Sequence, residues 1–162
     1  LYDFIVYTTG IKIPNKKICE HHTTPWRAFS DAYFAKTPVS VWHASRGFGG
    51  KSFLLSLLTW AEAVSLKADA NVLGASGEQS MRVYSHLMRY WTSPGCPKVL
   101  VGEPNKTLTK LKWGNQIQAL MASQASVRGP HPQRLRMDEI DEMQMEILDA
   151  AMGQPKIGRA HV

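Results

Sequence analysis

The segment from Ser45 to Ser52, which reads Ser-Arg-Gly-Phe-Gly-Gly-Lys-Ser, has the composition of a phosphate-binding loop. Glycines let the backbone wrap around an anion, so that its N–H groups point into one concavity. In such a loop the lysine, here Lys51, reaches the β- and γ-phosphates, and the hydroxyl of Ser52 holds Mg²⁺. The segment therefore predicts a site for ATP and Mg²⁺. The alternative is a glycine-rich loop with an incidental Lys-Ser pair.

The match to the general pattern G-x-x-x-x-G-K-[ST] is incomplete, because Ser45 stands where the pattern has glycine. The predicted nucleotide-binding residues of the loop are Ser45, Gly47, Phe48, Gly49, Gly50, Lys51 and Ser52.

A second segment, residues 134–139, offers a metal ligand and a base. Asp138, at the end of a predicted strand, is expected to hold the hydration shell of Mg²⁺, and Glu139 to orient and deprotonate the attacking water. Neighbouring side chains of an extended chain point to opposite sides, which suits two separate roles. The alternative is a solvated turn, since Asp141 and Glu142 make this segment an acidic cluster.

Hydrophobic periodicity predicts the elements that position these residues. We expect helices that begin near Gly50, near Ser76 and after Asp138, and strands over 39–44, 71–75, 107–113, 116–122 and 135–137. Gly114-Asn115 predicts a hairpin between the third and fourth of these strands. Strands that alternate with helices indicate an α/β fold with a mainly parallel sheet. With the phosphate loop, we expect a P-loop NTPase of the RecA/ASCE-like class, a three-layer sandwich that is incomplete at its C-terminus.

The two ends of the sequence are unusual. The chain starts with Leu1, and its last seven residues, Lys156 to Val162, resemble the translation of a sequencing-library adapter. We therefore expect a partial P-loop ATPase domain over 1–155, a non-native tail over 156–162, and a natural protein that continues past Pro155. The alternative is a genuine polar tail.

Composition limits the class of protein. The chain has 162 residues, of which 44% are hydrophobic and 20% charged, which is ordinary for a globular domain. It contains no apolar run long enough to span a membrane, and its two cysteines cannot form a four-ligand zinc site alone. The formal charge is +6, or +4 for residues 1–155 with 17 basic and 13 acidic residues. This excess is compatible with a nucleic-acid partner but does not demonstrate one.

The chain resembles the N-terminal ATPase domain of the terminase large subunit of tailed bacteriophages, the motor that packages DNA into the capsid. The resemblance rests on residues 45–52, on residues 122–143 and on the spacing between them, and it covers most of residues 20–155. Terminase loops often lack the first glycine and carry an arginine just before the glycines, as Ser45 and Arg46 do here. The resemblance implies that Arg46 acts in cis as an arginine finger; the alternative is a phosphate-contacting or surface arginine.

Terminases also hold adenine with a segment upstream of the phosphate loop, often through a glutamine. The corresponding segment here, residues 24–29, has no glutamine, and its candidates are Trp26 and Arg27, with core packing as the alternative for Trp26. Arg128 is a candidate sensor of the nucleotide or a contact to a neighbouring subunit, and otherwise a loop arginine. The coupling segment and the C-terminal nuclease domain of the family are not in this sequence.

The resemblance further implies that ATP hydrolysis, with Glu139 and Arg46 as catalytic residues, drives double-stranded DNA into the procapsid. The implied partners are DNA, the portal protein, the terminase small subunit and further copies in a homo-oligomeric ring, with no membrane. The implied location is the cytoplasm of the infected bacterial host, transiently on the procapsid. Two alternatives stay open: a helicase-like P-loop ATPase, whose signatures are not visible in residues 140–155, and a nucleotide-switched binding module without turnover, against which Glu139 argues.

Overall fold

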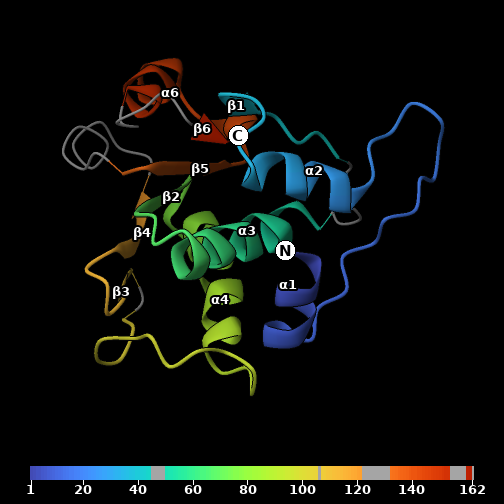
Figure 1. Ribbon diagram of the computed structural model, residues 1–162. Coiled ribbons are helices and arrows are strands. Elements are labelled where there is room, and N and C mark those ends of the chain that lie inside the picture. Colours follow the sequence, from blue (N-terminus) through green and yellow to red (C-terminus); the bar gives the residue numbers. More distant parts are fainter. Residues whose placement is uncertain (45–49, 106, 122–131, 154–159, 162) are drawn as a thin grey trace.

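The computed structural model describes the chain except residues 45–49, 106, 122–131, 154–159 and 162. Figure 1 shows a sheet with helices on both faces. The helices are α1 (Tyr2–Thr9), α2 (Pro25–Tyr33), α3 (Lys51–Ser65), α4 (Gly77–Trp91), the 3-10 helix η1 (Ile140–Glu142) and α6 (Met145–Met152). The strands are β1 (Val39–Ser40), β2 (Ala70–Gly74), β3 (Leu108–Lys110), β4 (Gln116–Met121), β5 (Arg134–Asp138) and β6 (Ala160–His161).

The main part of the sheet consists of four strands in the order β5-β2-β4-β3. β2 pairs in parallel with both β5 and β4, whereas β3 runs antiparallel to β4, which confirms the predicted hairpin and the mainly parallel sheet. At the β5 edge, the two-residue strand β6 lies between β5 and β1 and pairs in parallel with both. The register sets Gly74 beside Asp138, so β2 and β5 end together.

Alternation along the strands divides the core between the two faces of the sheet. One face packs against α3 and α4, whose Leu57, Leu58, Tyr84 and Leu87 are almost fully buried. The other face packs against α6, through a cluster that consists of Leu73, Leu120, Leu135, Met137, Ile147 and Ala151. The chain is thus an α/β domain in which a mostly parallel sheet is flanked by helices on both sides (Figure 1).

Three predicted elements differ from the structure. The strand expected over 107–113 covers only Leu108–Lys110, because its pairing with β4 ends at Lys110 opposite Gln116. The strand expected over 39–44 covers only Val39–Ser40 and is not buried, since Val41 is 66% exposed and, among the described residues, β1 pairs with β6 alone. The helix expected after Asp138 is divided into η1 and α6, because the backbone of Met143 between them is extended. Within the described residues, no helix combines the length and the apolar character that a membrane span requires.

Candidate nucleotide site

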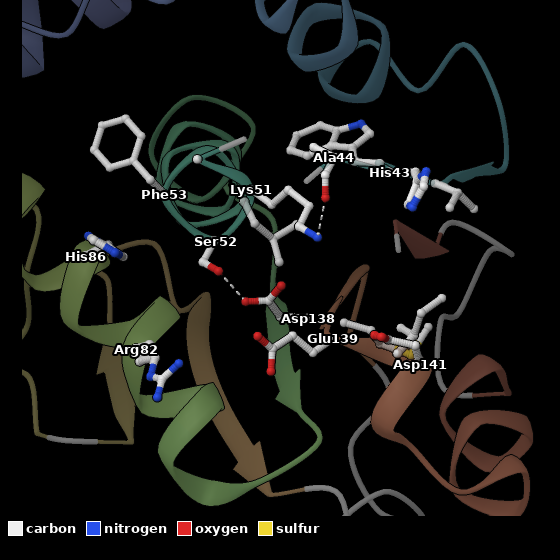
Figure 2. A pocket seen from close by; sticks show the side chains of 16 residues that line it. His43, Ala44, Lys51, Ser52, Phe53, Arg82, His86, Asp138, Glu139 and Asp141 are labelled. Carbon is white, nitrogen blue, oxygen red and sulfur yellow. Dashed lines mark hydrogen bonds between the residues drawn. The ribbon is translucent and has the colours of Figure 1, made fainter. Parts of the chain in front are cut away.

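A cavity of about 840 Å³ lies where α3 begins and β5 ends. Its lining includes Lys51, Ser52, Asp138 and Glu139, which come from two segments that are far apart in the sequence (Figure 2). The volume is in the range of small-molecule and cofactor sites. The structure therefore brings Lys51 and Ser52 of the predicted phosphate loop and the predicted acidic residues Asp138 and Glu139 to one cavity.

Lys51 is the first residue of α3 and follows Gly50, whose φ of 56° lies in the left-handed region that favours glycine. Glycine at the N-cap provides no side chain to cap the helix, and the N–H groups of a helix's first turn are natural donors to an anion. The ammonium of Lys51 donates to the backbone carbonyl of Ala44, at 3.1 Å (Figure 2). A cation and a positive helix end thus share one side of the cavity.

Ser52 and Asp138 form a direct contact between the two segments. The Ser52 hydroxyl donates to Oδ2 of Asp138 at 2.5 Å, across 86 positions of sequence (Figure 2). Asp138 is only 7% exposed, so its carboxylate is held among protein groups instead of in bulk water. This contact confirms the predicted proximity of the Ser52 hydroxyl and the Asp138 carboxylate.

The conformation of Glu139 differs from the one expected for an extended chain. Its φ of 56° and ψ of 51° are left-handed, an unfavourable conformation for a residue with a side chain. The chain therefore turns directly after Asp138, and both acids line the same cavity instead of pointing to opposite sides of a strand (Figure 2). Backbone strain of this kind is concentrated at functional sites in proteins.

These residues fit magnesium better than they fit a metal held by protein alone. Hydroxyl and carboxylate oxygens suit Mg²⁺, which usually takes one or two such ligands and completes its shell with water and substrate phosphates. In the part of the chain that the structure describes, no group of three or more His, Cys, Asp or Glu residues could hold a metal ion. Ser52 and Asp138 therefore match the partial ligand set of a metal that arrives with a nucleotide.

Sequence reasoning missed the other walls of the cavity. They include Trp42 and His43 before the phosphate loop, Phe53 on α3, and Arg82 and His86 on α4. His43 is exposed. Burial and the charge of Arg89 lower the pKa of His86, which favours its neutral imidazole. In the sequence, the feature that could have pointed to α4 as a wall of the cavity is the polar pair Arg82 and His86. These two residues are four positions apart and so lie one turn apart on the same face of a helix.

The proposed adenine residues lie elsewhere. Trp26 packs edge-on against Tyr2 and stacks on Phe29, with ring centroids 4.9 and 6.0 Å away, so it has the core role named as its alternative. Arg27 is mostly exposed and lies 3.7 Å from Asp31. Neither Trp26 nor Arg27 lines the cavity. The remaining predicted site residues, Ser45, Arg46, Gly47, Phe48, Gly49 and Arg128, lie outside the described residues.

Comparison with protein families finds no family model that matches the chain, and comparison with curated proteins finds no match. The function is therefore inferred from the chemistry and geometry of its own residues.

Proposed function

We propose that this chain is a P-loop ATPase domain that binds MgATP in the cavity between α3 and β5 and hydrolyses it. The observation that carries the proposal is the contact of Ser52 with Asp138, beside Lys51 and Glu139. A cation, a helix N-terminus, a hydroxyl and two carboxylates in one cavity are the groups that phosphoryl transfer requires, since this chemistry depends on positioning and charge neutralisation.

In the proposed reaction, the Lys51 ammonium exchanges the Ala44 carbonyl for oxygens of the β- and γ-phosphates. Ser52 and Asp138 would hold Mg²⁺, which neutralises charge on the same phosphates when bound. Glu139 accepts a proton from water as the water oxygen bonds to the γ-phosphorus. The bond from that phosphorus to the β–γ bridging oxygen breaks, and ADP and inorganic phosphate are the products.

We further propose, from the resemblance of residues 45–52 and 122–143, that the ATPase drives a terminase-like DNA-packaging motor. In that role double-stranded DNA is the substrate that moves, and the portal protein, a small subunit and further copies of the chain are partners. A phosphate-release assay with MgATP, with and without double-stranded DNA, tests both the proposed ATP hydrolysis and the proposed motor function. Release that DNA stimulates supports the motor, whereas tight MgATP binding without any release supports the nucleotide-switched module instead.

Arg82 offers a second positive charge at the cavity, from α4 (Figure 2). We expect Arg82→Ala to weaken ATP binding about five-fold, a modest loss because the side chain is exposed to solvent and screening. Equilibrium titration with a fluorescent ATP analogue measures the change. Arg89→Ala, two turns further along α4 and outside the cavity lining, is the matched control and should bind as the parent does. Equal affinities for all three proteins would contradict a role for Arg82.

A further inference from the structure

Three charged side chains lie between α3 and β5, away from the cavity; Glu62 and Arg136 are buried and Arg134 is partly exposed. Glu62 of α3 accepts from Nε of Arg134 through Oε1, at 3.1 Å, and from the guanidinium of Arg136 through Oε2. The side chains of Glu62, Arg134 and Arg136 are 1%, 11% and 0% exposed. We call these three residues the Glu62 cluster. Nothing in the proposed reaction uses them.

The two arginines of the Glu62 cluster and Asp138, the proposed metal ligand, belong to the same face of β5. Arg134, Arg136 and Asp138 alternate with Leu135 and Met137, which pack on the opposite face against α6. All three polar residues therefore face α3, where Arg134 and Arg136 bond to Glu62 and Asp138 bonds to Ser52. An entire face of the strand contacts one helix through polar groups.

The two contacts lie at opposite ends of the helix. Ser52 and Glu62 are ten residues apart in α3, which is about 15 Å along a helix axis. Arg134 and Asp138 are four residues apart in β5, which is about 13 Å along a strand. The near-equality of these lengths means that α3 lies along β5, attached at one end by Ser52 and Asp138 and at the other by the Glu62 cluster.

Directional contacts restrict sliding in a way that apolar packing does not. The hydrophobic effect is non-directional, so leucine and alanine side chains alone tolerate small shifts of a helix over a sheet. A buried carboxylate between two guanidinium groups does not, because a shift leaves buried charge unpaired. Setting the register of two elements is the best-attested use of buried polar groups.

We propose that Glu62, Arg134 and Arg136 are positioning residues that fix α3 lengthwise along β5 and thereby hold Ser52 and Asp138 at metal-binding distance. The proposal rests on the proposed function for its consequence, which is the affinity of the nucleotide site for Mg²⁺. Its structural part, the placement of α3, is independent of any ligand.

The test uses the double variant Glu62→Met/Arg136→Met, because well-packed apolar residues can replace a buried ion pair without loss of the fold. Arg134, partly exposed, keeps its contact to the carbonyl of Gln133. Tyr84→Phe is the matched control, since it removes a buried hydrogen bond to Thr109 that involves neither α3 nor β5. Thermal unfolding identifies whether both proteins are folded at the assay temperature.

Two measurements then decide whether the Glu62 cluster fixes the position of α3. Without nucleotide, amide hydrogen exchange over residues 54–56 should be about ten-fold faster in the double variant and unchanged in Tyr84→Phe. With nucleotide, the Mg²⁺ concentration for half-maximal ATP binding should rise about ten-fold, as in Ser52→Ala, while Mg²⁺-free ATP binding stays the same.

A folded double variant with parental exchange and parental Mg²⁺ dependence would overturn the positioning role. If the double variant does not fold, Glu62→Gln is measured in the same two ways. A parent chain that fails to bind MgATP would overturn the proposed function alone, and hydrogen exchange would still decide the placement of α3.

Discussion

Lys51→Ala is expected to weaken MgATP binding about 100-fold, the largest effect on affinity of any single substitution in the chain. The reason is the charge of the nucleotide. The Lys51 ammonium lies at the N-terminus of α3, beside the cavity, and its described partner is a neutral carbonyl that a phosphate oxygen can replace. Alanine removes the cation and leaves only backbone donors. Isothermal titration with ATP and Mg²⁺ measures the loss directly.

Lys67→Ala is the control for this experiment. Lys67 follows the opposite end of α3, and its ammonium lies 5.6 Å from the ring centre of Trp113, so the substitution removes the same charge from a remote place. Its MgATP affinity should equal that of the parent. If Lys51→Ala and the parent bind MgATP equally well, the segment around Lys51 is not a phosphate site.

Glu139→Gln is expected to retain MgATP binding and to lose hydrolysis by 10² to 10⁴-fold, roughly the contribution of a general base. Glutamine preserves the size of the side chain and its place in the cavity but cannot take a proton from water. A single-turnover measurement of phosphate release, with nucleotide binding followed in parallel, separates the two effects. The separation matters because Glu139 is adjacent to Asp138, and damage to the metal ligand would weaken binding as well.

Glu142→Gln tests whether any acid of this segment would give the same result. Glu142 lies in η1 three residues after Glu139, is exposed, and is not part of the cavity lining. Turnover in this variant should match the parent. Hydrolysis that survives in Glu139→Gln at the parental rate would exclude Glu139 as the base.

The sequence predicted that Ser52 and Asp138 serve the same magnesium ion, because each residue belongs to a recognisable local pattern. A glycine-rich turn before a helix and an acid at the end of a strand both belong to the carboxyl edge of a parallel sheet. Ser52 and Asp138 therefore could be expected to meet, and they do. The left-handed backbone of Glu139 could not be predicted, since nothing in a glutamate side chain favours that conformation.

The sequence contains a signal for the Glu62 cluster, but hydrophobic periodicity does not identify it. Glu62 is the one acid of α3, and Arg136 lies between the buried Leu135 and Met137 of β5. A charged residue flanked on both sides by apolar residues, in each of two elements, indicates a buried pair, because an unpaired charge would be too costly there. Which elements pack together depends on the tertiary fold, across the 74 positions that separate these two residues.

The contribution of α4 to the cavity also depends on the fold as a whole. Arg82 and His86 occupy what the sequence presents as the solvated face of an amphipathic helix. The register of β2 on β5, with Gly74 beside Asp138, brings the middle of α4 next to the cavity. The strand before the phosphate loop is shorter than predicted for a similar reason. The length of a strand depends on its pairing partners, and among the described residues β1 pairs with two, Ala160 and His161.

The most direct test of the MgATP site is a crystal structure of the Glu139→Gln variant with ATP and Mn²⁺ in place of Mg²⁺. We predict an anomalous manganese peak in the cavity, with the Ser52 hydroxyl as a direct ligand of the manganese. Asp138 should contact the manganese either directly or through one water, and the γ-phosphate should lie against Lys51. Nucleotide or metal bound outside the cavity between α3 and β5, or a cavity that stays empty at saturating MnATP, would contradict the assignment.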